Sequence, residues 1–254
     1  MFLADYHTHS KFSFDGTDSL ADMLAAAVRA GLDELCVTDH CDIGRDEQFL
    51  PEERYEVFKQ VGPAGCKLLL GLELGEPIND LAKAGVSVDA APYDFIIGSH
   101  HALRGEEDFY WLRFNSEDDF HRLMPRYFEE LRETAEWGRF DVLGHIDYPL
   151  RYTVRDGFEV PSLLPRYESE LRDLFKLFAE KGIGLEANVG NKLPDPAIYK
   201  LFRGCGGEIV TIGSDAHRVS AVGKNIKDGT DLVRAAGFGY IAAFENRKVR
   251  YEKI

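Results

Sequence analysis

The sequence predicts a parallel α/β fold, and three observations support this prediction. Short apolar runs alternate with stretches of helical periodicity along the whole chain of 254 residues, the pattern of repeated strand–helix units. Most runs are almost continuously apolar, as expected for parallel strands buried on both faces. No linker or change of composition divides the chain, so we expect one domain over residues 1–254. The predicted strands are 2–7, 34–40, 67–75, 93–100, 140–145, 182–188, 208–215 and 240–246.

Three stretches between these runs have the features of helices. Residues 18–30 begin with polar residues, continue with Ala and Leu, and are followed by Gly31, a common helix stop. Residues 117–137 and 162–181 carry apolar and aromatic residues at helical spacing, and we expect these stripes to face the core. Residues 101–116 are polar and aromatic without clear periodicity. They predict a long loop of the kind that often covers a functional site.

The composition argues against several classes of function. A net charge of −14 argues against binding of long nucleic acid or an anionic membrane, because phosphate-rich surfaces require a basic protein face. No run approaches the roughly 18 apolar residues of a membrane span, and no signal-peptide pattern is visible. The four cysteines form no CxxC pair, so we expect free thiols and a cytoplasmic protein.

Histidines and carboxylates gather at the ends of the predicted strands. The residues at these ends are His7 and His9, Asp39 and His40, Glu73, His100 and His101, His145, Glu186 and Asn188, and Asp215 and His217. The carboxyl ends of parallel strands lie on one face, which carries the chemistry in barrels. Along a strand, residues i and i+2 point to the same side, so His7 and His9 can aim two imidazoles at one metal ion.

Imidazole and carboxylate together are the usual ligands of zinc, iron and manganese. A catalytic metal takes three or four protein ligands, so about nine candidates fit two or three divalent ions (Zn, Fe or Mn). We select His100 over its neighbour His101 because it comes first after the apolar run. The candidate ligands are His7, His9, Asp15, His40, Glu73, His100, His145, Asp215 and His217.

Six motifs spread over nearly the whole chain resemble the polymerase-and-histidinol-phosphatase (PHP) family of metal-dependent phosphoesterases. They are "DYHTHS" (5–10), "VTDH" (37–40), "GLELGE" (71–76), "IIGSHH" (96–101), "DVLGHIDYPLRY" (141–152) and "TIGSDAHRVSAVG" (211–223). The last two are most similar to the histidinol-phosphatase branch. The resemblance implies a single PHP domain, folded as a distorted seven-stranded, TIM-like (β/α) barrel with a trinuclear metal site.

Carried over by motif, the resemblance assigns His7, His9, Glu73 and Asp215 to one metal ion. Glu73 would bridge to a second ion, which His100 and His145 would also hold. The third would be held by Asp15, His40 and His217. The motif position that Asp15 occupies varies in the family and is often histidine.

The implied reaction is hydrolysis of a phosphomonoester by a metal-bridging hydroxide. Glu73, Asp215 and His217 are the candidate catalytic residues, with Asp215 or His217 passing a proton to the leaving group. Four cationic residues follow strand ends and are candidates to bind the phosphate: Arg151, Arg155, Lys192 and Arg218. If histidinol phosphate is the substrate, its amine and imidazole would meet acidic or aromatic loop residues such as Asp42, Asp147, Tyr110 and Trp111.

Other functions stay open at this stage. A related enzyme could act on nucleotides, short oligonucleotides or phosphotyrosine. A metal-dependent C–N hydrolase could share the HxH motif, but such enzymes usually place a ligating lysine at a strand end, and no lysine ends a middle strand here. A non-catalytic binding module is disfavoured by the intact ligand set. Metal identity stays open, as does whether the chain forms a homo-oligomer.

Overall fold

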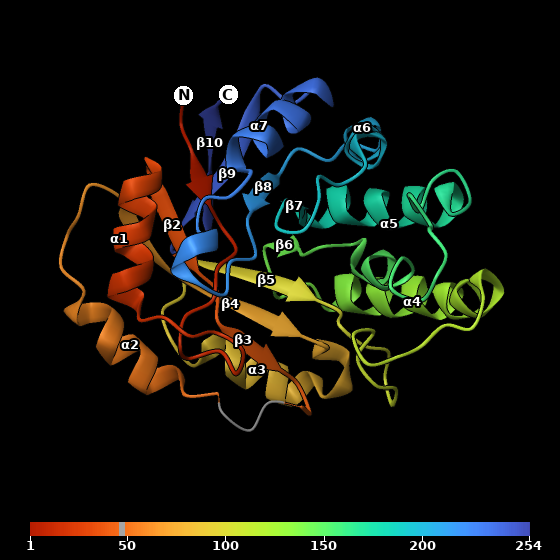
Figure 1. The fold of residues 1–254 in the computed structure, drawn as a ribbon, viewed down its shortest axis with the longest axis horizontal. Helices are drawn as coiled ribbons and strands as arrows, with labels where there is room; N and C mark the ends of the chain where they lie inside the picture. The colour runs from red at the N-terminus through yellow and green to blue at the C-terminus, as the bar shows by residue number, and fades with distance from the viewer. Residues whose placement is uncertain (46–48) are drawn as a thin grey trace.

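The computed structural model describes residues 1–45 and 49–254, and it shows a parallel barrel with helices around it (Figure 1). Paired strands follow the order β1-β2-β4-β5-β6-β7-β8 in the described chain. The ring closes because Tyr6 N donates to Ile212 O at 2.9 Å and Asp215 N donates to His7 O at 2.8 Å. The predicted seven-stranded α/β barrel is therefore confirmed. Its strands are β1 (Ala4–Asp5), β2 (Glu34–Val37), β4 (Lys67–Gly75), β5 (Phe95–Ser99), β6 (Val142–Leu143), β7 (Gly184–Asn188) and β8 (Val210–Gly213), with β3 (His40–Asp42) beside the end of β4.

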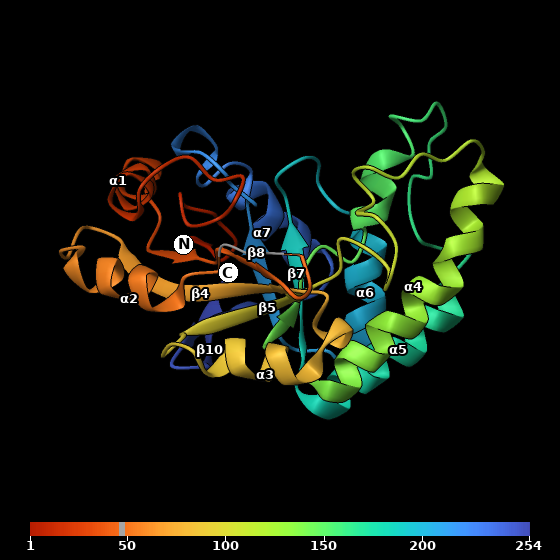
Figure 2. The same cartoon turned by 90° about the horizontal axis from the view of Figure 1, so that it is seen from below.

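Helices cover the outside of the barrel, and α4 and α5 run side by side at one edge (Figures 1 and 2). The α-helices in the described residues are α1 (Leu20–Ala30), α2 (Pro51–Gln60), α3 (Leu81–Asp89), α4 (Glu117–Trp137), α5 (Glu168–Lys181), α6 (Pro196–Gly204) and α7 (Ile226–Ala235). Short 3₁₀ helices are η1 (Pro77–Asn79), η2 (Tyr148–Tyr152) and η3 (Val219–Ala221). Ser19 caps the start of α1 and Gly31, with φ of 72°, ends it.

The predicted helix over residues 117–137 matches α4, whose apolar stripe is buried. The second predicted helix begins later than expected, at Glu168 instead of residue 162. Pro165 accounts for the difference, because the residue before a proline is disfavoured in helical conformation. Leu163 and Tyr167 are nevertheless buried, so the apolar positions ahead of the helix still contribute to the core.

The last predicted strand lies outside the barrel. β9 (Tyr240–Glu245) pairs antiparallel with β10 (Lys248–Lys253), a strand that the sequence did not predict. This hairpin covers the end of the barrel where the strands begin: Arg247 N donates to Asp94 O, one residue before β5. Phe244 packs there against Phe95, with ring centroids 4.8 Å apart. The candidate site lies at the opposite end, where the strands finish.

The loop over residues 101–116 is anchored rather than loose. Phe109 and Phe114 are buried, and Phe109 N donates to His101 O at 2.8 Å. Tyr110 and Trp111 are exposed. The loop thereby forms a fixed wall beside the carboxyl end of the barrel.

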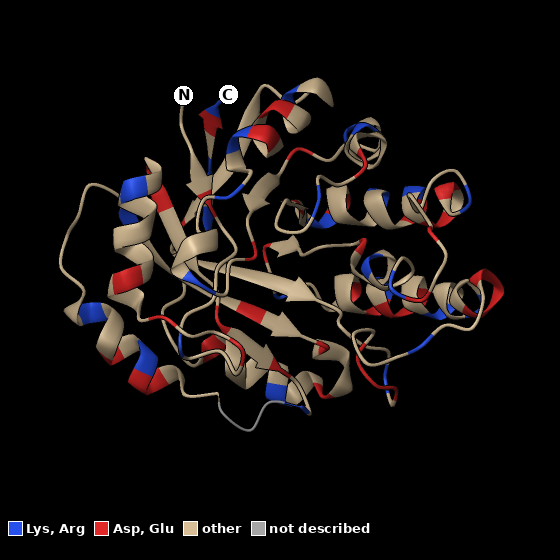
Figure 3. Ribbon diagram, viewed as in Figure 1, with Lys and Arg blue, Asp and Glu red and all other residues tan. Residues whose placement is uncertain are grey.

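Charges of both signs alternate along the outer helices α2, α4 and α5 (Figure 3). Such mixing, together with the net charge of −14, gives those helices no basic face for a phosphate backbone. Among the residues that the structure describes, no helix is both long and apolar enough to span a membrane.

Candidate metal centre

Glu73 lies at the centre of a ring of imidazoles. It is on β4, near the carboxyl end, and its side chain is fully buried. One oxygen, Oε2, is 3.1 Å from both His7 Nε2 and His40 Nδ1 and 3.4 Å from His9 Nε2. The other, Oε1, is 2.9 Å from His145 Nε2 and 3.2 Å from His101 Nε2. The two oxygens therefore face two different sets of histidines, which is the arrangement that a bridging carboxylate requires.

A second group forms around Asp215, where the chain leaves β8. Asp215 Oδ1 lies 3.6 Å from His7 Nε2 and 3.5 Å from His9 Nε2. Asp215 has a φ of 54°, a conformation rare for residues with a side chain and one that tends to occur at functional sites. Barrel closure brings Asp215 next to His7 and His9, because Asp215 N donates a hydrogen bond to His7 O.

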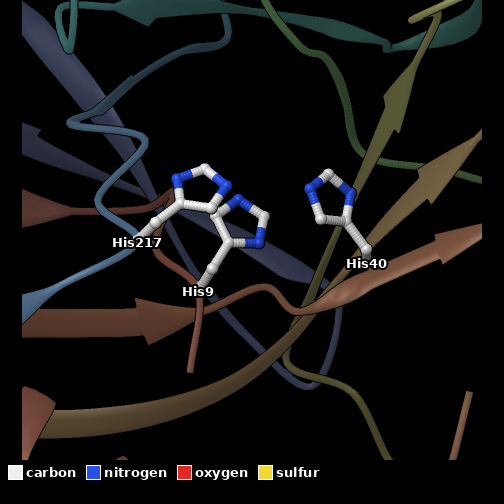
Figure 4. Close-up of side chains that lie close together, drawn as sticks. All are labelled: His9, His40 and His217. Atoms are coloured by element: carbon white, nitrogen blue, oxygen red, sulfur yellow. The ribbon is translucent and has the colours of Figure 1, made fainter. Parts of the chain in front are cut away.

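The third group contains His9, His40 and His217, which come from three separate segments (Figure 4). The His9 ring stacks on His217 and on His40, with centroids 4.2 Å and 4.4 Å apart. Asp15 reaches the same place, since its Oδ2 is 3.0 Å from His217 Nε2 and its Oδ1 is 3.8 Å from His40 Nε2. The side chain of Asp15 is 39% exposed, far more than those of the other carboxylates here.

The structure corrects the choice between the two adjacent histidines. His100 points away from the cluster, and its Nε2 lies 2.7 Å from Thr134 Oγ1 on helix α4. His101 takes the expected place beside Glu73. The reason is that β5 ends at Ser99, and Glu76 then turns the chain by accepting hydrogen bonds from His101 N and Ala102 N.

Charge in the cluster is arranged to attract a cation. Burial alone would lower the pKa of His7 and His40, but carboxylates, Glu73 among them, outweigh it and raise both well above the ordinary value. Burial would likewise raise the pKa of Glu73, yet the surrounding imidazoles hold it well below its usual range. In His9 burial dominates, and the pKa falls to about 3.

The residues present fit metal ions. His9 Nε2 and His40 Nδ1 are buried and have no hydrogen-bond partner in the part of the chain that the structure describes, although both face Glu73. Nitrogen and oxygen donors in such sets suit Zn, Fe or Mn. The donor sets that converge are His7, His9 and Glu73; His7, His145 and Asp215; His40, Glu73 and His101; and His9, His40 and His217.

Two further carboxylates, Glu186 and Asp42, lie beside the imidazoles, and the sequence did not assign either of them to a histidine. Glu186 Oε1 lies 2.6 Å from His7 Nδ1, and its Oε2 accepts from His145 N. Asp42 lies 3.5 Å from His40 Nδ1 and 3.8 Å from His101 Nδ1. Such partners orient the rings of metal-binding histidines. The sequence placed Glu186 at a strand end and named Asp42 only as a contact of the leaving group, whereas Glu76 carried no signal beyond its motif.

Of the four cationic residues predicted to bind phosphate, the structure places only Arg151 in the site. Its side chain, on η2, is 16% exposed and contacts Asp215 Oδ2 at 3.1 Å and Asn188 Oδ1 at 2.9 Å. Arg155 instead pairs with Asp156 at 2.7 Å and bonds to loop carbonyls. Lys192 lines a different cavity, and Arg218 is exposed outside the site cavity.

A cavity of about 240 Å³ opens over the cluster. Of the four residues expected near the leaving group, Asp42 and Tyr110 line it, whereas Asp147 lines the neighbouring cavity and Trp111 lines neither. Asp108, which sequence reasoning missed, also lines it, and its Oδ1 accepts from Tyr148 Oη at 3.1 Å. The remaining lining residues are Phe14, Asp15, His40, His101, His145, Tyr148, Arg151, Tyr152, Asn191, Asp215 and His217.

Residues 5–190 match the sequence model of the PHP domain. This chain belongs to the PHP domain family. Within this PHP domain, the matched range contains Glu73 and the histidines around it. Asp215 and His217 lie beyond that range, and closure of the barrel brings them to the same cluster.

Known PHP-type proteins resemble the chain over almost its full length. A histidinol-phosphatase of Lactococcus lactis is 27% identical over 98% of this chain and 97% of its own. A probable histidinol-phosphatase of Thermotoga maritima is 26% identical over 94% and 95%. The solved histidinol phosphate phosphatase of Lactococcus lactis, complexed with zinc, L-histidinol and phosphate, has a TM-score of 0.84 at 24% identity and covers 98% of both chains. This likeness confirms the fold.

Proposed function

We propose that this protein is a metal-dependent phosphomonoesterase, namely a histidinol-phosphatase that hydrolyses L-histidinol phosphate to L-histidinol and phosphate. The observation that carries the proposal is the position of Glu73, whose two oxygens face five imidazoles at 2.9–3.4 Å. Similarity to curated histidinol-phosphatases over nearly the full chain supports this choice of substrate. Such an enzyme would serve histidine biosynthesis, and we propose that it works in the cytoplasm.

Two or three divalent ions (Zn, Fe or Mn) would be held by the converging side chains. His7, His9, Glu73 and Asp215 would hold one; Glu73, His101 and His145 a second; and Asp15, His40 and His217 a third. Ions bound in this way lower the pKa of a shared water and neutralise charge on phosphoryl oxygens.

Arg151 would bind the outer oxygens of the phosphate. Its guanidinium is held by Asp215 and Asn188, so it needs little reorganisation to present its remaining N–H groups to the cavity. Asp215 is the candidate to pass a proton to the leaving oxygen, directly or through a bound water, and His217 is the alternative.

The leaving group would lie against the acidic and aromatic wall of the cavity. Asp108 and Asp42 line it together with Tyr110, and these carboxylates suit an amine or a protonated imidazole. Asp108 is fixed in place because its Oδ1 accepts hydrogen bonds from Tyr148 Oη and Tyr110 N.

A substrate screen tests the proposal. The protein reconstituted with Zn, Fe or Mn is assayed at steady state with histidinol phosphate, nucleoside monophosphates and phosphotyrosine. We expect kcat/KM for histidinol phosphate to exceed the others by about 100-fold, because buried polar groups left unpaired penalise the wrong leaving group. Preference for a nucleotide or phosphotyrosine would overturn the substrate assignment, and absence of hydrolysis with every metal would overturn the proposed function as a whole.

A further inference from the structure

Behind His9, on the side away from Glu73, a chain of buried polar groups leads to helix α2. Ser13 Oγ lies 3.0 Å from His9 Nδ1 and 3.1 Å from Asp39 Oδ1. Asp39 Oδ2 lies 2.6 Å from Arg54 Nε, on α2. Ser13, Asp39 and Arg54 are each no more than 4% exposed. An arginine buried this deeply requires a partner, and the partner it has reaches a candidate metal ligand through one hydroxyl.

The hydrogen bonds in this chain have only one consistent direction. Asp39 pairs with Arg54 and also accepts from Ser10 N and Ser10 Oγ, so the carboxylate acts as acceptor throughout. Ser13 Oγ must therefore donate its single hydrogen to Asp39. It already accepts from His40 N at 3.0 Å, and its one remaining role is to accept again. The group that donates to it is the Nδ1–H of His9.

We propose that Ser13, Asp39 and Arg54 form a positioning relay that fixes His9 in the tautomer with its proton on Nδ1. The lone pair of Nε2 is then directed toward Glu73 and Asp215, where Nε2 lies 3.4 Å and 3.5 Å from the carboxylate oxygens. The relay deepens the proposed function and rests on it, because it prepares His9 to bind a cation. A neutral imidazole coordinates through one nitrogen while the other holds the ring.

Arg54 connects the relay to the scaffold. Its Nη2 donates to Val37 O, at the end of β2, and its Nε faces Asp39 two residues later. The Arg54 guanidinium thus holds Asp39 from α2, and Asp39 in turn holds the segment from Ser10 to Ser13. Helix α2 thereby sets the orientation of the His9 ring through Asp39 and Ser13.

The tautomer of His9 in the metal-free protein is the direct readout. Long-range ¹H–¹⁵N NMR of the wild type should show His9 with a protonated Nδ1 and an unprotonated Nε2. Ser13→Ala should give a mixture of tautomers, and Ser13→Thr, which keeps the hydroxyl, should restore the wild-type signals. A wild-type His9 protonated on Nε2 overturns the relay, whichever variants fold.

Cation affinity gives a second readout. Competition with a chelator for Zn should show the affinity of one ion falling by about 10–100-fold in Ser13→Ala, the usual effect of losing such a partner. Ser10→Ala is the matched control, because it also removes a hydroxyl that donates to Asp39 but leaves the His9 contact intact. Equal affinities in wild type and Ser13→Ala would overturn the relay alone. A wild type that binds no cation would overturn the proposed function.

Discussion

A carboxylate has two oxygens, and at Glu73 each oxygen faces a separate group of imidazoles. A second oxygen of this kind is what allows one side chain to hold two cations close together. Asp15 differs from Glu73 in its exposure and in its partners. Its side chain is partly exposed, and its ion-pair contacts among the described residues are with His40 and His217 alone. The two carboxylates should therefore differ in the number of ions that depend on them.

We expect Glu73→Gln to lose two bound ions and nearly all activity, whereas Asp15→Asn should lose no more than one ion. The amide keeps the size of each side chain and removes its charge, so packing is matched in the two variants. Metal analysis of the purified proteins, together with kcat/KM for histidinol phosphate, measures both effects. Equal, small losses in the two variants would contradict a bridging role for Glu73.

His100 and His101 offer a comparison of neighbours. His101→Ala should remove a cation, because its Nε2 faces Glu73 Oε1 at 3.2 Å. His100→Ala should keep the full metal content and lower the free energy of unfolding by about 1–3 kcal/mol, since Thr134 Oγ1 loses a buried partner. Metal analysis and urea unfolding separate these outcomes. A loss of metal in the His100 variant alone would show that the assignment is reversed.

At the scale of elements, the β9–β10 hairpin and the site occupy opposite ends of the barrel. Phe244 is 3% exposed and packs against Phe95 and Tyr6, and its backbone N–H donates to Tyr6 Oη at 2.8 Å. Tyr6 in turn donates to Glu34 at 2.7 Å. The hairpin therefore closes the core at the end away from the candidate metal ligands.

Phe244→Ala should lower the free energy of unfolding by about 3–5 kcal/mol, the cost of removing a buried aromatic ring. The kcat/KM of the folded fraction should stay at the wild-type value. Val249→Ala, on the exposed strand β10, is the control and should change stability by only about 0.5 kcal/mol. Chemical unfolding at fixed metal content measures both, and a fall in kcat/KM without loss of stability would contradict this division of roles.

The same elements show which parts of the fold and the site could be predicted from the sequence. Continuous apolar runs identified the barrel strands, and their ends identified most of the cluster, because parallel strands bring those ends together. The pair His100–His101 could not be resolved, since a shift of one residue in the end of a strand reverses which side chain faces inward. Arg151 could not be separated from Arg155, because side-chain directions in loops follow no period. β10 alternates charged residues with Val249 and Tyr251, so it lacks the continuous apolar run that identified the barrel strands.

At the scale of the whole molecule, the barrel concentrates buried charge that a cation or protons must balance. In the metal-free protein, burial opposes a proton on His101, but Glu73 and Asp42 outweigh it and raise its pKa from the ordinary 6.5 to about 9. The pKa of His7 and His40 is raised for the same reason. At pH 7 these rings hold protons where a metal would bind.

Metal binding should therefore release protons at pH 7, because a coordinating nitrogen must give up its proton. A group whose pKa is raised on folding stabilises the metal-free fold below its ordinary value of 6.5, and for His101 this contribution is lost as the pH rises through about 9. The apparent affinity for Zn should rise with pH over this same interval. Proton release should then shrink above pH 9, where His101 is already neutral.

Titration calorimetry in two buffers of different ionisation enthalpy counts the protons, and His101→Ala should release fewer of them at pH 7. Binding without proton release at pH 7 would show that the imidazoles are neutral before the cation arrives.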